Sequence, residues 1–139
     1  MTNPIVFISH FRIKEGSLEA YRQLQREVAR MLEAEKPRTL VFLTYVDAEG
    51  SQMTAVHVFA DAESMDLHFE GAAERSAAAY EFLVPDGWEI YGTPSANVIE
   101  MMRGAAASSG VRLNVQAELV AGFVRAASVA TESAERPSG

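Results

Sequence analysis

The sequence contains no cysteine. This absence excludes disulfides, zinc–thiolate centres, iron–sulfur clusters and a cysteine nucleophile, and the compartment we expect is a reducing cytoplasm. Histidine is scarce, with 3 residues, and none has a carboxylate at a spacing typical of a metal site. Glycine-rich phosphate loops, GxSxG elbows and HExxH are absent as well. We therefore expect no metal and no cofactor.

Basic residues are few. The chain has 12 Lys and Arg against 19 Asp and Glu, a net charge of −7, and the basic residues form no cluster. Nucleic acids and anionic membranes both need a Lys/Arg footprint, so neither is an expected partner. The first residues lack the basic leader and apolar run of a signal peptide. No segment approaches the roughly 20 apolar residues that cross a bilayer.

What is present suits one folded domain. The chain has 139 residues, of which 48% are hydrophobic, enough to build a core without covalent cross-links. We expect a domain over residues 1–129, with a C-terminal extension that begins at about residue 95. Residues 130–139 are polar, and we expect a disordered tail there.

Apolar spacing and turn residues predict the elements. The expected strands cover residues 4–13, 39–46, 53–59 and 88–91, the last of them after a turn at 85–87. One helix begins at Leu18 and stops before Pro37, and a second helical region follows Asp61 and is divided by Gly71. The order β-α-β-β-α-β is that of the ferredoxin-like α+β fold. The extension adds a helix from Ser95 to Gly110 and a fifth strand over 111–116. Residues 119–124 either continue this strand or pair with another chain.

Alternation along these strands assigns two sheet faces. We expect the helices to cover the nearly all-apolar face: Ile5, Phe7, Phe11, Ile13, Leu40, Phe42, Val46, Val56 and Val58. The opposite face mixes apolar and polar residues: Val6, Ile8, His10, Arg12, Val41, Leu43, Tyr45, Met53, Ala55, His57 and Phe59. This second face is too apolar to meet water, so the sequence predicts a homodimer with two such sheets face to face around a small-molecule chamber. In this topology the first and third strands are neighbours, so we expect His10 and His57 to lie close together.

Four segments carry a family resemblance: ISHFRIKEGSLEAY, KPRTLVFLTY, VHVFADAESMDLHF and WEIYGTP. Over residues 4–94 the pattern resembles the antibiotic biosynthesis monooxygenase-like proteins of the dimeric α/β-barrel superfamily. The resemblance implies cofactor-free oxygenation of phenolic or anthrone-type compounds, in which the protein deprotonates the substrate and shelters a carbanion that reacts with oxygen. His68 falls where many members carry a histidine. Haem-degrading relatives place an axial histidine where this chain reads RSAAAYEF, so the resemblance argues against haem.

The candidate catalytic residues are His57 as the general base, with His10 and Tyr45 to stabilise an oxyanion. The candidate substrate-binding residues are Arg12, Phe59, His68 and Trp88. Each has a structural alternative: a histidine or tyrosine packed in the interior, a solvated arginine, a surface histidine, or aromatic core residues.

Three functions remain open from the sequence. The first is a cofactor-independent monooxygenase that oxidises a phenol, quinol or anthrone-type molecule. The second is a non-catalytic dimer that binds a small molecule in the same chamber. The third is a related barrel cyclase or isomerase, which needs the same base but no oxygen.

Overall fold

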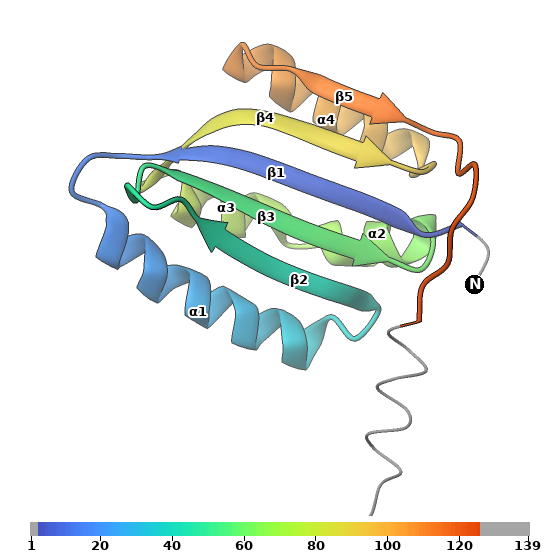
Figure 1. Cartoon of the computed structure of the whole chain (residues 1–139), viewed down its shortest axis with the longest axis horizontal. Coiled ribbons are helices and arrows are strands. Elements are labelled where there is room, and N and C mark those ends of the chain that lie inside the picture. The colour runs from blue at the N-terminus through green and yellow to red at the C-terminus, as the bar shows by residue number, and fades with distance from the viewer. Residues whose placement is uncertain (1–2, 126–139) are drawn as a thin grey trace, which may run out of the picture.

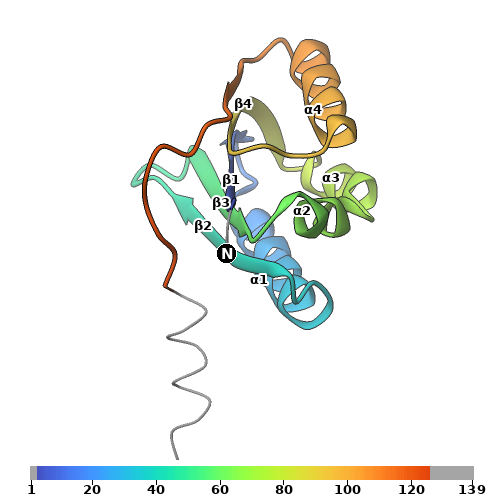
Figure 2. The same cartoon turned by 90° about the vertical axis from the view of Figure 1, so that its right-hand side faces the viewer.

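The computed structural model describes residues 3–125. The strands are β1 Ile5–Ile13, β2 Thr39–Val46, β3 Gln52–Phe59, β4 Leu83–Tyr91 and β5 Leu113–Gln116, and the helices are α1 Leu18–Glu35, α2 Ala62–Phe69, α3 Ala72–Ala79 and α4 Ala96–Ser109. The helices all lie on one side of a single sheet, whose other side is left open (Figure 1, Figure 2). The tail predicted over residues 130–139 lies outside the described residues.

The sheet has the strand order β2-β3-β1-β4-β5. β1 pairs antiparallel with both β3 and β4, which makes it the central strand of the ferredoxin-like unit. β5 pairs parallel with β4, so α4 is the crossover that brings the chain back to the same edge. The predicted α+β fold with a helix-strand extension is confirmed, and the dimeric barrel remains a prediction.

Local signals set the helix ends. Asp61 is the N-cap of α2, and its carboxylate accepts the backbone N–H of Ser64 at 2.8 Å. Gly71 separates α2 from α3 with a φ of +81°, a left-handed conformation that other residues rarely adopt. The division predicted at this glycine is confirmed. Among the described residues, no helix is long and apolar enough to span a membrane.

β4 starts earlier than the sequence predicts. The segment expected to be a turn, residues 85–87, belongs to β4. Along this segment the register of β4 against β1 shifts between His10 and Phe11. His10 lies opposite Gly87 and Phe11 opposite Pro85, so the intervening residue is a bulge that lets the strand continue past a proline. After β5 the described chain has no further strand, and Leu119 to Val124 are exposed.

The face assignment of β3 is wrong by one residue. His57 lies directly opposite Phe7 of β1, and residues that pair in this way share a face. Met53, Ala55, His57 and Phe59 are therefore buried under the helices, whereas Val56 and Val58 are on the open face. Alternation could not fix this phase, since both faces of β3 are largely apolar and a one-residue slip leaves an equally plausible pattern.

Candidate functional site

A cavity of about 600 Å³ lies between the sheet and the helices. Its floor is the helix-facing side of β1, β2, β3 and β4, and its walls come from α1, α2, α3 and α4. The floor residues are Phe7, Ser9, Phe11, Phe42, Met53, Ala55, His57, Leu83 and Trp88. A concave, mainly apolar space with a few polar groups is the usual form of a small-molecule site.

His57 is a polar residue of the cavity floor. Its Nδ1 lies 3.1 Å from the carbonyl oxygen of Phe7, and because a carbonyl only accepts, Nδ1 carries the proton. The other ring nitrogen, Nε2, then holds a lone pair. Nε2 has no partner in residues 3–125, and it is not among the fully buried polar atoms that lack one, so it opens to the cavity.

His68 meets His57 from the helix side. The two rings are edge to face, with centroids 5.1 Å apart and planes at 76°. Nδ1 of His68 is hydrogen-bonded to the hydroxyl of Thr39 at 2.7 Å. His68 also lines a second, smaller pocket of about 180 Å³ near Pro37 and Thr39. It therefore separates the cavity from this outer pocket.

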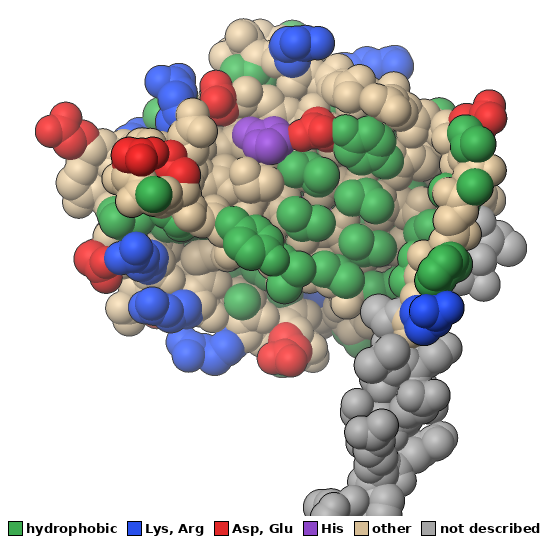
Figure 3. All heavy atoms as spheres, viewed as in Figure 1, with side chains coloured by type: hydrophobic (Ala, Val, Ile, Leu, Met, Phe, Trp, Pro, Cys, Tyr) green, Lys and Arg blue, Asp and Glu red, His purple; other side chains and the backbone are tan. Residues whose placement is uncertain are grey.

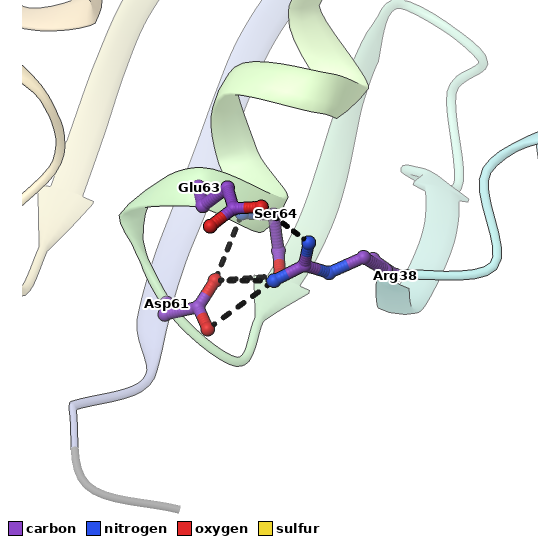
Figure 4. Close-up of polar contacts among 4 residues, drawn as sticks. All are labelled: Arg38, Asp61, Glu63 and Ser64. Carbon is purple, nitrogen blue, oxygen red and sulfur yellow. Dashed lines mark hydrogen bonds and ion pairs between the residues drawn. The ribbon is translucent and has the colours of Figure 1, made fainter.

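An ionic cluster connects the start of β2 to the start of α2 (Figure 4). Arg38 donates to Glu63 at 2.9 Å and to the two carboxylate oxygens of Asp61 at 3.3 and 3.4 Å. Asp61 in turn caps α2 through Ser64. Exposed ion pairs add little stability. This cluster is next to Thr39, however, and holds the start of α2, the helix that carries His68, against the start of β2.

Both histidines are neutral at physiological pH. Burial lowers the pKa of His57 to about 4, and the charge of Arg75 acts in the same direction. Burial also lowers the pKa of His68 to about 3, with the neighbouring His57, Arg75 and Lys36 as further causes. A neutral imidazole with a free Nε2 is a proton acceptor.

Aromatic side chains enclose the histidines. Trp88 lines the cavity at 5% exposure and meets Phe11 in a T-shaped contact with centroids 6.0 Å apart. Phe59 packs against both histidine rings but is fully buried and does not reach the cavity surface. Trp88 is thus placed to contact a ligand directly, and Phe59 supports the histidines from behind.

The remaining candidates lie on the open face, away from the cavity. His10 bonds to Glu89 and lies 3.3 Å from the Thr54 hydroxyl, and the hydroxyl of Tyr91 also donates to Glu89. Arg12 lies 3.8 Å from Asp86 at the end of β1. The Tyr45 side chain is 58% exposed. Figure 3 shows a broad apolar area on this face, with a histidine and an acidic side chain at its margin.

The expected grouping of His57 with His10 and Tyr45 is therefore wrong. Strand alternation places His57 under the helices and His10 and Tyr45 on the opposite face, because His10 pairs with Thr54 and not with His57. The structure instead brings together His57, His68 and Trp88. It also adds two cavity residues of α3 and its C-cap, Arg75 and Tyr80. Their only sequence signal is their place on a helix with an apolar inner stripe.

No three His, Asp or Glu side chains in the described part of the chain are arranged to hold a metal ion. The two cavity histidines have Arg75 beside them, whose positive charge disfavours a cation. The expected lack of metal and cofactor stays a prediction.

The chain matches no protein-family model and no curated protein sequence. Solved structures do resemble it. MupZ from Pseudomonas fluorescens superposes with a TM-score of 0.66 at 20% identity, over 89% of this chain and 96% of its own. A candidate antibiotic biosynthesis monooxygenase from Caulobacter crescentus CB15 gives a TM-score of 0.56 at 14% identity, over 63% of this chain and 87% of its own. SnoaB, a cofactor-independent oxygenase from Streptomyces nogalater, superposes with a TM-score of 0.55 at 10% identity, over 68% of this chain and 97% of its own.

This chain shares the fold of these solved structures. MupZ covers the extension as well as the ferredoxin-like unit, because its match spans 89% of this chain, whereas SnoaB matches 68%. At these identities the similarity establishes the architecture, and the chemistry has to be argued from the cavity.

Proposed function

We propose that this protein is a cofactor-independent monooxygenase that oxidises an aromatic small molecule in the cavity between the sheet and the helices. The observation that carries the proposal is His57: a buried, neutral histidine with its Nδ1 proton fixed by a backbone carbonyl and its Nε2 open to an aromatic-lined cavity of about 600 Å³. The fold is shared with SnoaB, which is described as a cofactor-independent oxygenase.

The proposed reaction begins with proton transfer. Nε2 of His57 accepts a proton from the acidic phenol or activated methylene of the substrate, which leaves a resonance-stabilised carbanion. The apolar lining keeps water from reprotonating it. The carbanion then reacts with molecular oxygen as the co-substrate. For a methylene carbon the overall change is conversion of CH₂ to C=O, with one oxygen atom entering the product and the other leaving as water.

The other cavity residues take supporting roles in this proposal. Trp88 provides a flat wall for an aromatic ring. His68 contacts His57 and bonds to Thr39, and it fixes the imidazole from the helix side. Tyr80 lines the same cavity, and burial raises the pKa of its hydroxyl, so it stays protonated as a donor. It takes over in the cavity the role that the sequence suggested for Tyr45.

We further propose that the protein is a homodimer in which the open sheet faces pack together. The open face carries a field of apolar side chains (Figure 3): Val6, Ile8, Val41, Leu43, Tyr45, Val56 and Val58. A monomer rarely exposes a patch of this kind. The C-terminal arm, residues 117–125, stands out on the same side of the sheet, with Val120 85% and Phe123 77% exposed (Figure 2). A second copy would cover both the face and the arms in one symmetric contact.

A non-catalytic binding protein is the second candidate. The observation in its favour is the low pKa of His57, about 4, because a weakly basic imidazole removes a phenolic proton slowly. The same cavity would then hold an aromatic ligand without turning it over.

Oxygen uptake with the anthrone dithranol separates these candidates, with the protein-free rate subtracted. We expect accelerated oxygen consumption and formation of the quinone. His57→Ala should lower the rate by about a hundredfold or more, while His10→Ala, on the other face, should leave it near that of the wild type. Saturable binding without oxygen consumption would support the binding protein. Loss of activity in His10→Ala but not in His57→Ala would place the chemistry on the open face.

A further inference from the structure

The cavity contains a cation, Arg75, that forms no ion pair with a carboxylate in the described part of the chain. Arg75 of α3 lines the cavity and is half-buried. Its Nη2 donates to the carbonyl of His68 at 2.6 Å, and its Nη1 donates to the carbonyl of Glu70 at 3.2 Å. Within residues 3–125 it forms no ion pair. The two carbonyls hold the guanidinium in place but leave part of its five N–H donors unused.

The other charged groups do not balance Arg75. His57 and His68 are neutral. Glu74 also lines the cavity, but its side chain is exposed and forms no ion pair with Arg75 in residues 3–125. Lys36 donates to the carbonyls of Leu67 and Glu70 and lines the outer pocket, not the cavity. The large cavity thus combines an apolar surface with a fixed, partly desolvated positive charge.

A desolvated cation without a counter-ion is unfavourable, and an anion that enters the cavity relieves that cost. The contacts with His68 and Glu70 already explain how Arg75 satisfies the C-terminal carbonyls of α2. That structural role needs the side chain to reach the helix end, but it does not need the guanidinium to border a cavity beside two neutral histidines.

We propose that Arg75 binds an oxyanion, and that the ligand of this cavity is an aromatic molecule carrying a carboxylate or an ionised phenol. The inference deepens the proposed function and relies on it only for the place where the ligand binds. A planar guanidinium donates two parallel hydrogen bonds to a carboxylate, or one to a phenolate. If the anion is the phenolate formed when His57 removes a proton, Arg75 favours that ionisation directly.

Trp88, the single tryptophan of the chain, reports binding inside the cavity. The test measures quenching of its fluorescence by anthraquinone-2-carboxylate and by the neutral, nearly isosteric anthraquinone-2-carboxamide. The wild type should bind the carboxylate about tenfold or more tightly, the effect of a charged hydrogen bond. Arg75→Gln should abolish this preference. Arg30→Gln, the same substitution at an exposed position of α1 outside the cavity lining, should keep it. A wild type without a preference, or a folded Arg75→Gln that retains it, would overturn the proposal.

The phenolate source is tested separately with 2-hydroxyanthraquinone, whose visible absorption reports ionisation. Its apparent pKa should fall on binding to the wild type and stay unchanged on binding to Arg75→Gln. If the protein prefers the carboxylate but does not lower the pKa of the bound phenol, the ligand is an aromatic acid. If it lowers the pKa of the phenol but shows no preference for the carboxylate, the ligand is a phenol that reacts as its anion.

These measurements do not require turnover. A carboxylate preference without oxygen uptake leaves Arg75 as an anion site and rejects the monooxygenase. Oxygen uptake without any Arg75-dependent preference rejects the anion site alone. If neither anthraquinone quenches Trp88, the cavity is not the binding site and both proposals fail. Should Arg75→Gln misfold, the wild type's own preference and its weakening by salt still decide the matter.

Discussion

The carbonyl oxygen of Phe7 accepts a hydrogen bond from Nδ1 of His57, 3.1 Å away, on the neighbouring strand. This contact fixes the imidazole tautomer that leaves Nε2 as an acceptor facing the cavity. Since the donor is a side chain and the acceptor is backbone within the sheet, the ring cannot turn without breaking the bond. The strand pairing thus sets the protonation geometry of the proposed base.

We expect His68→Asn to slow oxidation of dithranol, but by less than His57→Ala. Asparagine can still bond to Thr39, yet it removes the ring that packs edge to face against His57. The loss should appear in kcat more than in KM, because the base and not the aromatic wall is disturbed. A variant slower than His57→Ala would identify His68 as the base. Steady-state kinetics on the two variants decide between them.

Acid should destabilise the fold through the buried histidines. In the unfolded chain they take up protons near pH 6.5, whereas in the fold the pKa is about 4 for His57 and about 3 for His68. The free energy of unfolding should therefore decrease as pH falls from 6.5 toward 4, by up to about 1.4 kcal/mol per pH unit for each histidine.

His57→Phe isolates this effect, because it removes one titrating group. Urea unfolding from pH 7 to pH 4 should show a shallower decline for the variant than for the wild type. Parallel declines would mean that His57 is not kept neutral by the fold, and the argument for its role as a base would lose its support.

The element order and most helix ends followed from the sequence. Asp61 marked the start of α2, Gly71 its separation from α3, and Pro37 the stop after α1, since each has a local conformational cause. The phase of β3 did not follow, because both of its faces are largely apolar and only pairing of Phe7 with His57 settles the register. The role of Arg75 could not be predicted either, because it depends on hydrogen bonds to carbonyls at the end of another helix.

The open face should hold the dimer together. Leu43 is 47% exposed there, and Leu43→Asp would place a charge in the centre of the apolar contact. We expect this variant to be a folded monomer at micromolar concentration by light scattering. Gln23→Asp, an equal change in charge on exposed α1, should stay dimeric. A monomeric wild type, or a dimer undisturbed by Leu43→Asp, would rule out this interface.

The C-terminal arm should strengthen the same dimer. A chain that ends at residue 117 keeps β5, which pairs with its own β4, but loses the exposed Leu119, Val120 and Phe123. Its dimer should dissociate at higher concentrations than the full-length dimer in sedimentation equilibrium. An unchanged dissociation constant would show that the arm does not contact the second copy.

The central claim is that ligands bind between the sheet and the helices and not on the open sheet face. A crystal structure with bound anthraquinone-2-carboxylate tests it most directly. We predict ring density beside Trp88, with the carboxylate within hydrogen-bonding reach of the Arg75 guanidinium. Ligand density on the opposite face, against His10 and Tyr45, with the cavity empty, would contradict it.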